Sequence, residues 1–472
     1  MTTWETIAYI IEKAILVYAI SIFTSYVILA VVSVIELRKY MRKRKFIDYN
    51  TIVSSPFAPS ISIIAPAYNE SKSIVENVRA MLSLFYHDFE VIIVNDGSTD
   101  NTLELMIEAY DLEEVDFAYT YKVECEEVKR IFKSQNKSYA NLTVVDKVNG
   151  ACKADAMNGG INIAQRDYIV AIDADSILAP DTLLKLAKPF LEEKDKRVIG
   201  VGGVLRVVNS SKVESGQIVK MNFPKSLLAR FQVIEYTRAF LMGRVAWSKL
   251  DGLLIISGAL GMFDKDIMIK SGGYYSGSIG EDMELVIRMR KYMMDHKLKY
   301  KVVYIPDPLC YTEVPETLKD LGKQRNRWAK GTIDNLQRHR SMMLRPKYKM
   351  VGMISMPYWF VFERMAPIVE LFGLLYFITI AILGHPNWPF FFIMLGFVYL
   401  FSVTFSTNAL LYEELTFHRF NRKKDLVRLL LTAWIEPLIY HPLVFLWALK
   451  GNIDFYLLGR KGWNYVKKKG FH

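Results

Sequence analysis

Long apolar runs occur near both ends of the chain and leave a more polar middle region between them. Residues 14–35 contain no charged side chain, and about 20 helical residues are enough to cross the hydrocarbon core of a bilayer. The basic cluster 38–45 follows directly, with no small-residue cleavage site. This run therefore predicts a retained membrane anchor rather than a signal peptide. The positive-inside rule places the residues after it in the cytoplasm.

Three further apolar runs follow the middle region, at 352–383, 389–411 and 429–449. The first is longer than one crossing needs and contains Glu363 and Glu370, so it predicts an interfacial or re-entrant helix followed by a spanning helix. The uncharged linker after it is typical of an outside hairpin, and the basic linker 412–428 is typical of an inside loop. The basic tail after Trp447 is not explained by three C-terminal crossings, because these would place the tail outside the cell, where basic segments are unusual. Either one run is re-entrant or the tail is an exception to the rule.

In the middle region, short apolar groups alternate with helical patterns. Strands are predicted at 61–65, 89–94, 142–145 and 168–172, helices at about 71–85 and at 153–165, and a polar, irregular insertion at 111–139. Such alternation predicts an α/β fold with a mostly parallel sheet. Ligands of these sheets bind beyond the carboxyl ends of the strands. Polar clusters follow the predicted strands, so we expect clusters that are distant in sequence to meet in one cleft.

Composition and charge narrow the class of protein. A hydrophobic share of 51% and a charged share of 23% exclude a disordered chain. The net charge of +11 is exceeded by the membrane-flanking stretches alone, which carry +6 at 38–45, +2 at 412–428 and +5 from Lys450 onward. The remainder is slightly negative, which argues against a nucleic-acid-binding surface. The three cysteines are far apart and form no CxxC pair, which excludes a disulfide framework.

The segment Asp173-Ala174-Asp175 follows an apolar strand and is the most informative of the polar clusters. In an extended chain, residues i and i+2 point the same way. Two carboxylates at a strand end can hold a hard divalent cation together with substrate phosphates. The alternative is a solvated turn, because a bare D-x-D is common.

Four other polar residues also occur where a strand ends or a helix begins. Asp96 lies in a glycine-containing turn, and it could simply form an Asx turn. Lys153 opens a helical stretch and could pair with a diphosphate, although a solvated lysine is the ordinary outcome. Glu281 and Asp282 begin another helical pattern, where the helix dipole alone favours acids.

The segment Gln324-Arg325-Asn326-Arg327-Trp328 lies in a basic helical stretch. Gln324, Arg327 and Trp328 share one helix face at spacings of three and four. An arginine suits a phosphate and a tryptophan suits a sugar ring. An amphipathic helix lying on the membrane explains the same pattern, with the tryptophan at the interface.

Taken in order, these groups resemble one family. They are Pro66–Glu70, Val94–Asp100, Lys153 with Asn158, Asp173–Asp175, Gly280–Asp282 and Gln324–Trp328. The set resembles the membrane-bound family 2 glycosyltransferases, which include the poly-N-acetylglucosamine, hyaluronan, chitin and cellulose synthases. The resemblance covers about residues 60–330.

The resemblance implies a GT-A (Rossmann-like) α/β fold and inverting transfer from a UDP-sugar, with Mg²⁺ or Mn²⁺ as cofactor. Asp282, beside Glu281, would be the catalytic base, and Asp175 would ligate the metal. The donor side would comprise Pro66, Tyr68, Glu70, Asp96, Lys153, Asp173, Arg325 and Arg327. The acceptor side would comprise Gly258, Gln324 and Trp328. A carboxylate base that removes the proton of the acceptor hydroxyl contributes roughly 10²–10⁴ in rate.

The resemblance also implies the organisation of the chain. Residues 1–45 would form the anchor and its basic flank, 46–345 a cytosolic GT-A domain with interfacial helices, and 346–472 the C-terminal interfacial and transmembrane helices with a basic tail. The protein would be a multi-pass protein of the plasma membrane. A single N-terminal crossing is fewer than several of these synthases have, and no appended regulatory domain is visible.

Three functions stay open from sequence. The first is a processive polysaccharide synthase that exports its product between its membrane helices. The second adds a single sugar to a lipid or lipid-linked acceptor, and the third is a non-catalytic membrane scaffold. The expected partners are a UDP-sugar, the acceptor and membrane lipids, whereas the oligomeric state stays undetermined.

Overall fold

The computed structural model describes residues 3–44, 55, 57–214, 216–384, 386–417 and 422–459. The basic residues Lys45 and Arg419, and those from Arg460 onward, lie outside these ranges, as does His385 of the linker.

A ten-stranded sheet forms the centre of the middle region, in the order β3-β4-β5-β2-β1-β6-β11-β8-β12-β7. Its strands are β1 (Ile61–Ala67), β2 (Phe89–Asn95), β3 (Leu112–Glu114), β4 (Val128–Ser134), β5 (Leu142–Lys147), β6 (Tyr168–Ile172), β7 (Ile177–Leu178), β8 (Arg197–Val207), β11 (Leu260–Asp264) and β12 (Tyr300–Thr312). A separate hairpin pairs β9 (Lys212–Glu214) with β10 (Gln217–Lys220). The strands of the parallel half are apolar and buried on both faces, as strands covered by helices on both sides must be.

The sheet is parallel in one half and mixed in the other. β5, β2, β1 and β6 pair in parallel, which agrees with the strands expected from sequence. β11 runs antiparallel to both of its neighbours, β6 and β8. The expected irregular insertion at 111–139 is wrong in part, because β3 and β4 extend the sheet antiparallel to β5 there. Only Ile131 and Phe132 of strand β4 are buried, so the strand lacks the longer apolar run that marks a fully buried strand.

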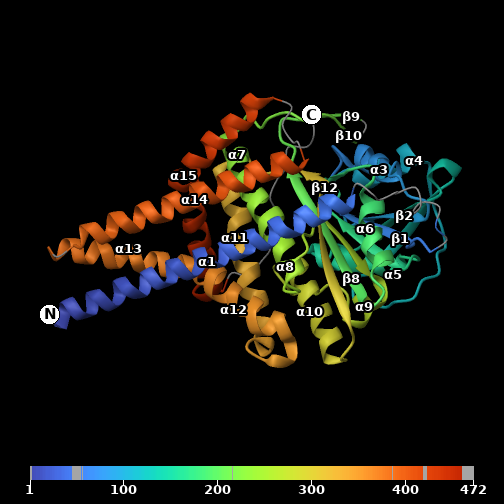
Figure 1. Cartoon of the computed structure of the whole chain (residues 1–472). Coiled ribbons are helices and arrows are strands. Elements are labelled where there is room, and N and C mark those ends of the chain that lie inside the picture. Colours follow the sequence, from blue (N-terminus) through green and yellow to red (C-terminus); the bar gives the residue numbers. More distant parts are fainter. Residues whose placement is uncertain are drawn as a thin grey trace.

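Helices cover both faces of the sheet (Figure 1). They include α3 (Ile74–Leu82), α4 (Thr102–Tyr110), α5 (Lys153–Ile163), α6 (Thr182–Glu192), α9 (Lys265–Lys270) and α10 (Glu281–Asp295). α5 lies close to β1, because a Cβ atom on Gly160 would come within 2.4 Å of Ile64. This close approach brings the beginning of α5, with Lys153, to the carboxyl ends of the strands.

A second group of helices joins the sheet to the apolar segments. It comprises α7 (Leu227–Tyr236), the π-helix η2 (Thr237–Arg244), α8 (Val245–Lys249) and α11 (Leu318–Arg338), followed by η5 (Val351–Ser355), α12 (Met356–Tyr358) and η6 (Trp359–Arg364). A bend of 40° separates the segment ending at Arg364 from α13 (Ala366–Ile382). The expected break within the apolar run 352–383 is therefore present in the structure.

Three helices of the described chain are long and apolar enough to cross a membrane, and the bent pair would make a fourth span. The three are α1 (Thr3–Arg44), α14 (Trp388–Phe417) and α15 (Lys423–Tyr456). α1, α13 and α14 extend together away from the sheet (Figure 1). Aromatic contacts join them, with Phe23 stacked on Phe401 and Phe377 on Phe391.

α15 runs across the direction of these three helices, against the inner side of the bundle (Figure 1). Its second half packs along α11, a helix rich in charged residues. Asp454 accepts a hydrogen bond of 2.8 Å from Asn326, and a hydrogen bond of 2.7 Å joins Gln337 to Tyr456. The apolar run that matched a third crossing thus packs on α11. The hydrophobic periodicity of the sequence cannot distinguish a helix that crosses the membrane from one that packs on α11.

Candidate active site

One large cavity opens at the carboxyl ends of β1, β2 and β6 and continues between the apolar helices. Its volume is about 2090 Å³, well above the roughly 300–1,000 Å³ of a pocket for one small molecule. Every candidate residue from the sequence lines it, from Pro66 on β1 to Trp328 on α11. Further along, its wall is formed by α1, α13, α14 and α15, with side chains such as Ile22, Phe401 and Leu438.

The loops after β1 and β2 form one end of the cavity and hold each other in place. Asn69 has a positive φ of 57°, a conformation that asparagine tolerates better than most residues. Its side-chain oxygen accepts a hydrogen bond of 2.8 Å from the backbone N–H of Thr99, and its own N–H donates to the Ser98 hydroxyl at 3.0 Å. The neighbouring ring of Tyr68 remains 39% exposed. The Tyr68 ring is therefore accessible, on a loop that side-chain hydrogen bonds hold in place.

Asp96 at the end of β2 is held by a lysine that the sequence analysis did not select. Lys147 is fully buried and donates a hydrogen bond of 2.9 Å to Asp96, and it also pairs with Asp155. Burial works to lower the pKa of Lys147, but its bonds to Asp155 and Asp96 outweigh burial and raise the pKa. The backbone N–H of Gly150 adds a hydrogen bond of 3.1 Å to the same Asp96 oxygen. The Asp96 carboxylate is therefore fixed at the cavity wall.

Asp173 and Asp175 follow β6 and line the cavity, as the spacing of the motif predicts. Lys153 at the start of α5 forms an ion pair with Asp173 and donates a hydrogen bond of 2.7 Å to the carbonyl oxygen of Gly258. Burial works to lower the pKa of Lys153, but the charges of Asp173, Glu281 and Asp282 outweigh burial and raise the pKa. Lys153 thus connects Asp173 to the segment that precedes β11.

Asp282 lies in the first turn of α10, opposite Gly258. One of its carboxylate oxygens accepts a hydrogen bond of 3.1 Å from the Gly258 N–H, and the other accepts one of 2.8 Å from the N–H of Met283. The helix N-terminus favours a negative charge at this position. Burial, and then the charge of Asp282, raise the pKa of the adjacent Glu281. Two carboxyl groups in different environments therefore stand side by side at the cavity.

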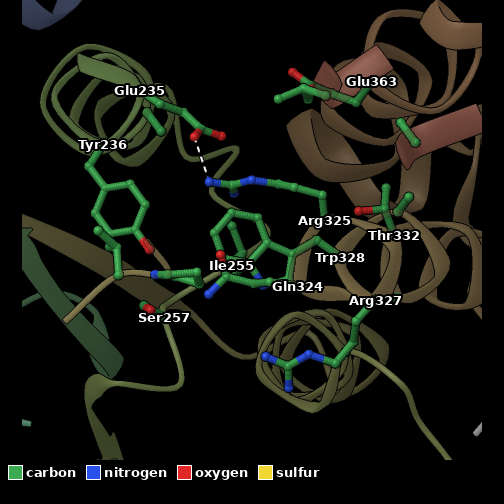
Figure 2. A pocket seen from close by; sticks show the side chains of 18 of the residues that line it. Glu235, Tyr236, Ile255, Ser257, Gln324, Arg325, Arg327, Trp328, Thr332 and Glu363 are labelled. Atoms are coloured by element: carbon green, nitrogen blue, oxygen red, sulfur yellow. Dashed lines mark hydrogen bonds and ion pairs between the residues drawn. The ribbon is translucent and has the colours of Figure 1, made fainter. Parts of the chain in front are cut away.

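α11 contributes Gln324, Arg325, Arg327 and Trp328 to the cavity wall (Figure 2). Trp328 is 41% exposed, whereas Arg325 is only 4% exposed. Arg325 donates a hydrogen bond of 2.6 Å to Glu235 on α7 (Figure 2) and another of 2.9 Å to the hydroxyl of Tyr440 on α15. These partners differ from the diphosphate that we expected for Arg325. The reason is helical geometry, because residue 325 is turned about 200° from residue 327 and faces α7 and α15.

Among the residues that sequence reasoning missed, Lys147 and Glu235 carry charges that orient candidate side chains. Lys147 ends a buried strand next to Asp146, and a lysine at such a place is unusual enough to have been a signal. Glu235 lies in an ordinary amphipathic pattern and gave no signal.

The fold and the acidic cavity at the ends of its parallel strands define a glycosyltransferase of the GT-A type. The chain belongs to the family described as "Glycosyltransferase like family 2", which matches residues 58–331. It is 26% identical over 384 residues to a poly-beta-1,6-N-acetyl-D-glucosamine synthase of Staphylococcus epidermidis, covering 80% of each chain. It is 30% identical over 305 residues to a synthase of the same name from Staphylococcus aureus, covering 64% of this chain and 60% of the other.

A solved structure supports the fold. The mannosyltransferase PcManGT from Pyrobaculum calidifontis, determined in complex with GDP-Man and Mn²⁺, has a TM-score of 0.52 and 18% sequence identity. The likeness covers 89% of this chain and 99% of that chain. It therefore extends beyond the sheet to the flanking helices.

Proposed function

We propose that this protein is an inverting membrane glycosyltransferase that transfers a sugar from a UDP-sugar to a growing polysaccharide. The observation that carries the proposal is one continuous cavity, which runs from Asp173, Asp175 and Asp282 to the apolar helices. A donor, an acceptor end and the emerging product could share it. N-acetylglucosamine is the first sugar to test, because the Staphylococcus relatives are named for that polymer.

In the proposed reaction Asp282 takes the proton of the acceptor hydroxyl as the oxygen attacks the anomeric carbon. Its hydrogen bonds to Gly258 and Met283 aim the carboxylate into the cavity, and the start of α10 favours its ionised form. Attack on the face opposite the leaving nucleotide gives inversion. Lys153 holds the Gly258 segment against Asp173, so the acceptor side and the donor side keep a fixed distance.

The donor-binding roles follow the walls of the cavity. Tyr68, Glu70, Asp96 and Pro66 would hold the nucleoside, and Arg327 would stabilise the diphosphate by charge. Gln324, Trp328 and Gly258 would contact the acceptor sugar. Arg325 is assigned a different role below, because its guanidinium is engaged by Glu235.

The residues present fit a divalent metal whose remaining ligands come from the donor. Among the described residues, no group of three or more His, Cys, Asp or Glu side chains is arranged to hold an ion. Asp175 and Asp173 nonetheless offer carboxylate oxygens at the cavity wall, and Mg²⁺ is commonly held by one or two carboxylates plus substrate phosphates. Bound there, Mg²⁺ or Mn²⁺ would neutralise the charge that develops on the leaving diphosphate.

We further propose that α1, α13 and α14 cross the plasma membrane, with the region 46–345 in the cytosol, and that α15 lies along the membrane surface. Three crossings would return the chain to the cytosolic side, where a basic tail obeys the positive-inside rule. Single cysteines at Asn387 and Leu458 test this division in intact cells. A membrane-impermeant maleimide should label only the first, and labelling of the second from outside would contradict the placement of α15.

The addition of a single sugar to a lipid-linked acceptor is the second candidate function. The apolar lining of the cavity between α1 and α14 favours it. A lipid tail would fit that lining, and the enzyme would then add a single sugar to a lipid-linked acceptor.

One experiment separates the two functions. The purified protein in lipid nanodiscs receives UDP-N-acetylglucosamine, other UDP-sugars or GDP-mannose with Mn²⁺. Nucleotide release and product mass are then measured. A ladder of polymer lengths supports the synthase, and a product one sugar longer than a lipid acceptor supports the second function. Failure to release nucleotide from every donor would refute both.

A further inference from the structure

Three side chains from three helices meet beside the acceptor wall of the cavity. Arg325 of α11 donates to Glu235 of α7 at 2.6 Å and to the Tyr440 hydroxyl of α15 at 2.9 Å. The Tyr440 hydroxyl in turn donates to Glu235 at 2.7 Å. The three polar groups therefore form a closed triangle, which we call the Arg325 triangle.

The Arg325 triangle is in direct contact with Trp328. The guanidinium carbon of Arg325 lies 4.1 Å from the centre of the Trp328 ring, a distance typical of a cation–π contact. Residues three apart on a helix are neighbours, so the geometry of α11 favours this stacking. The Trp328 ring also approaches Tyr236, with ring centroids 6.5 Å apart. The exposed ring is therefore held by Arg325, whose guanidinium is fixed in turn by Glu235 and Tyr440.

Exposure differs sharply along this chain of contacts. Tyr440 is 2% exposed and does not line the cavity, whereas Trp328 is 41% exposed and does. A sugar in the cavity can touch Trp328 but cannot touch Tyr440. Any influence of the Tyr440 hydroxyl on sugar binding must therefore pass through its partners Arg325 and Glu235, and Arg325 stacks on the Trp328 ring.

We propose that Glu235, Arg325 and Tyr440 are positioning residues that fix the Trp328 ring for the acceptor sugar, so that the seating of α15 on the catalytic part sets acceptor affinity. This inference rests on the proposed function, in which Trp328 contacts the acceptor. It assigns a role in acceptor binding to Tyr440, which belongs to the apolar helix α15 but does not itself line the cavity. It also replaces the donor role that the sequence suggested for Arg325.

Tyr440→Phe is the most selective test, because it removes one hydroxyl and leaves the ring on Phe231, 5.2 Å away between centroids. Binding of a β-1,6-linked N-acetylglucosamine tetramer is measured by calorimetry with full-length protein in nanodiscs, without turnover. We expect the affinity for the tetramer to fall about three- to tenfold. The affinity for UDP-N-acetylglucosamine should stay unchanged.

Tyr412→Phe is the matched control. The Tyr412 hydroxyl donates a hydrogen bond of 3.0 Å from α14 to the Val34 carbonyl of α1, and Tyr412 does not line the cavity. This variant loses a similar interhelical bond with no path to Trp328. We expect both affinities to equal those of the wild type, with any change confined to the melting temperature.

A double-mutant cycle distinguishes positioning from general stabilisation. In a Trp328→Ala background, Tyr440→Phe should have no further effect on tetramer binding, because the ring that it positions is gone. Equal effects in both backgrounds, or an unchanged tetramer affinity in folded Tyr440→Phe, would overturn the proposal. A wild type that releases UDP but binds no tetramer would also overturn it. Absence of UDP release in the wild type would instead refute the proposed function.

Discussion

Replacing Asp282 by asparagine tests the proposed chemistry most directly. The substitution keeps the size of the side chain and removes its ability to accept a proton. A general base contributes roughly 10²–10⁴ in rate, which corresponds to about 2.7–5.4 kcal/mol at about 1.36 kcal/mol per factor of ten. We therefore expect nucleotide release at saturating donor and acceptor to fall at least about a hundredfold.

The structure also indicates how much stability Asp282→Asn should lose, independently of its effect on catalysis. Both carboxylate oxygens of Asp282 accept backbone hydrogen bonds, from Gly258 at 3.1 Å and from Met283 at 2.8 Å. An asparagine has one such oxygen, so one of the two bonds is lost at about 0.5–1.5 kcal/mol. The melting temperature should fall slightly, and donor affinity should be maintained.

Asp264→Asn supplies the matched control for Asp282→Asn. Asp264 is buried, caps α9 through a hydrogen bond of 3.1 Å from the Ile267 N–H, and does not line the cavity. Asp264→Asn should lower the melting temperature without a comparable loss in the rate of nucleotide release. The reasoning would be refuted if Asp282→Asn retained more than about a tenth of the wild-type rate, because a proton acceptor cannot contribute so little.

Three further substitutions test separate parts of the site. Asp175→Asn should weaken donor binding about tenfold or more in the presence of Mn²⁺, since a carboxylate ligand is lost; equal affinities by calorimetry would contradict the metal role. Trp328→Ala should raise the acceptor KM and leave the donor KM unchanged, and a matching rise in both would contradict an acceptor-side role. Lys153→Met removes a cation that lowers the pKa of Glu281. That pKa should then rise, and an unchanged Glu281 titration followed by NMR would count against this coupling.

Much of the catalytic half could be predicted from sequence because its strands are short, apolar and followed directly by polar residues. The parallel order of β1, β2, β5 and β6 implied that Asp96 and Asp173 would meet at one edge, and both line the cavity. The roles of these residues in the reaction stay predictions until the substitutions are measured.

The remaining features depend on contacts between distant parts of the chain. The partners of Lys147, Asp96 and Asp155, come from two different segments, and no spacing in the sequence connects the three. The direction of Arg325 was accessible from helical periodicity, but the identity of its partners Glu235 and Tyr440 was not. α15 is as apolar as a crossing helix. Only its packing on α11 favours a position along the membrane surface over a crossing.

The length of α1 has a consequence for how the enzyme sits at the bilayer. Its 42 residues form a rod of about 63 Å at about 1.5 Å per residue, roughly twice the hydrocarbon thickness. Toward its C-terminal end, Ser33 donates a hydrogen bond of 2.6 Å to the Leu241 carbonyl, and Leu37 is buried. With α1 as the proposed membrane crossing, these two contacts would fix the distance of the sheet from the bilayer. One residue inserted into α1 before Ser33 would shift the N-terminal part of the helix by about 1.5 Å and turn it by about 100° relative to these contacts.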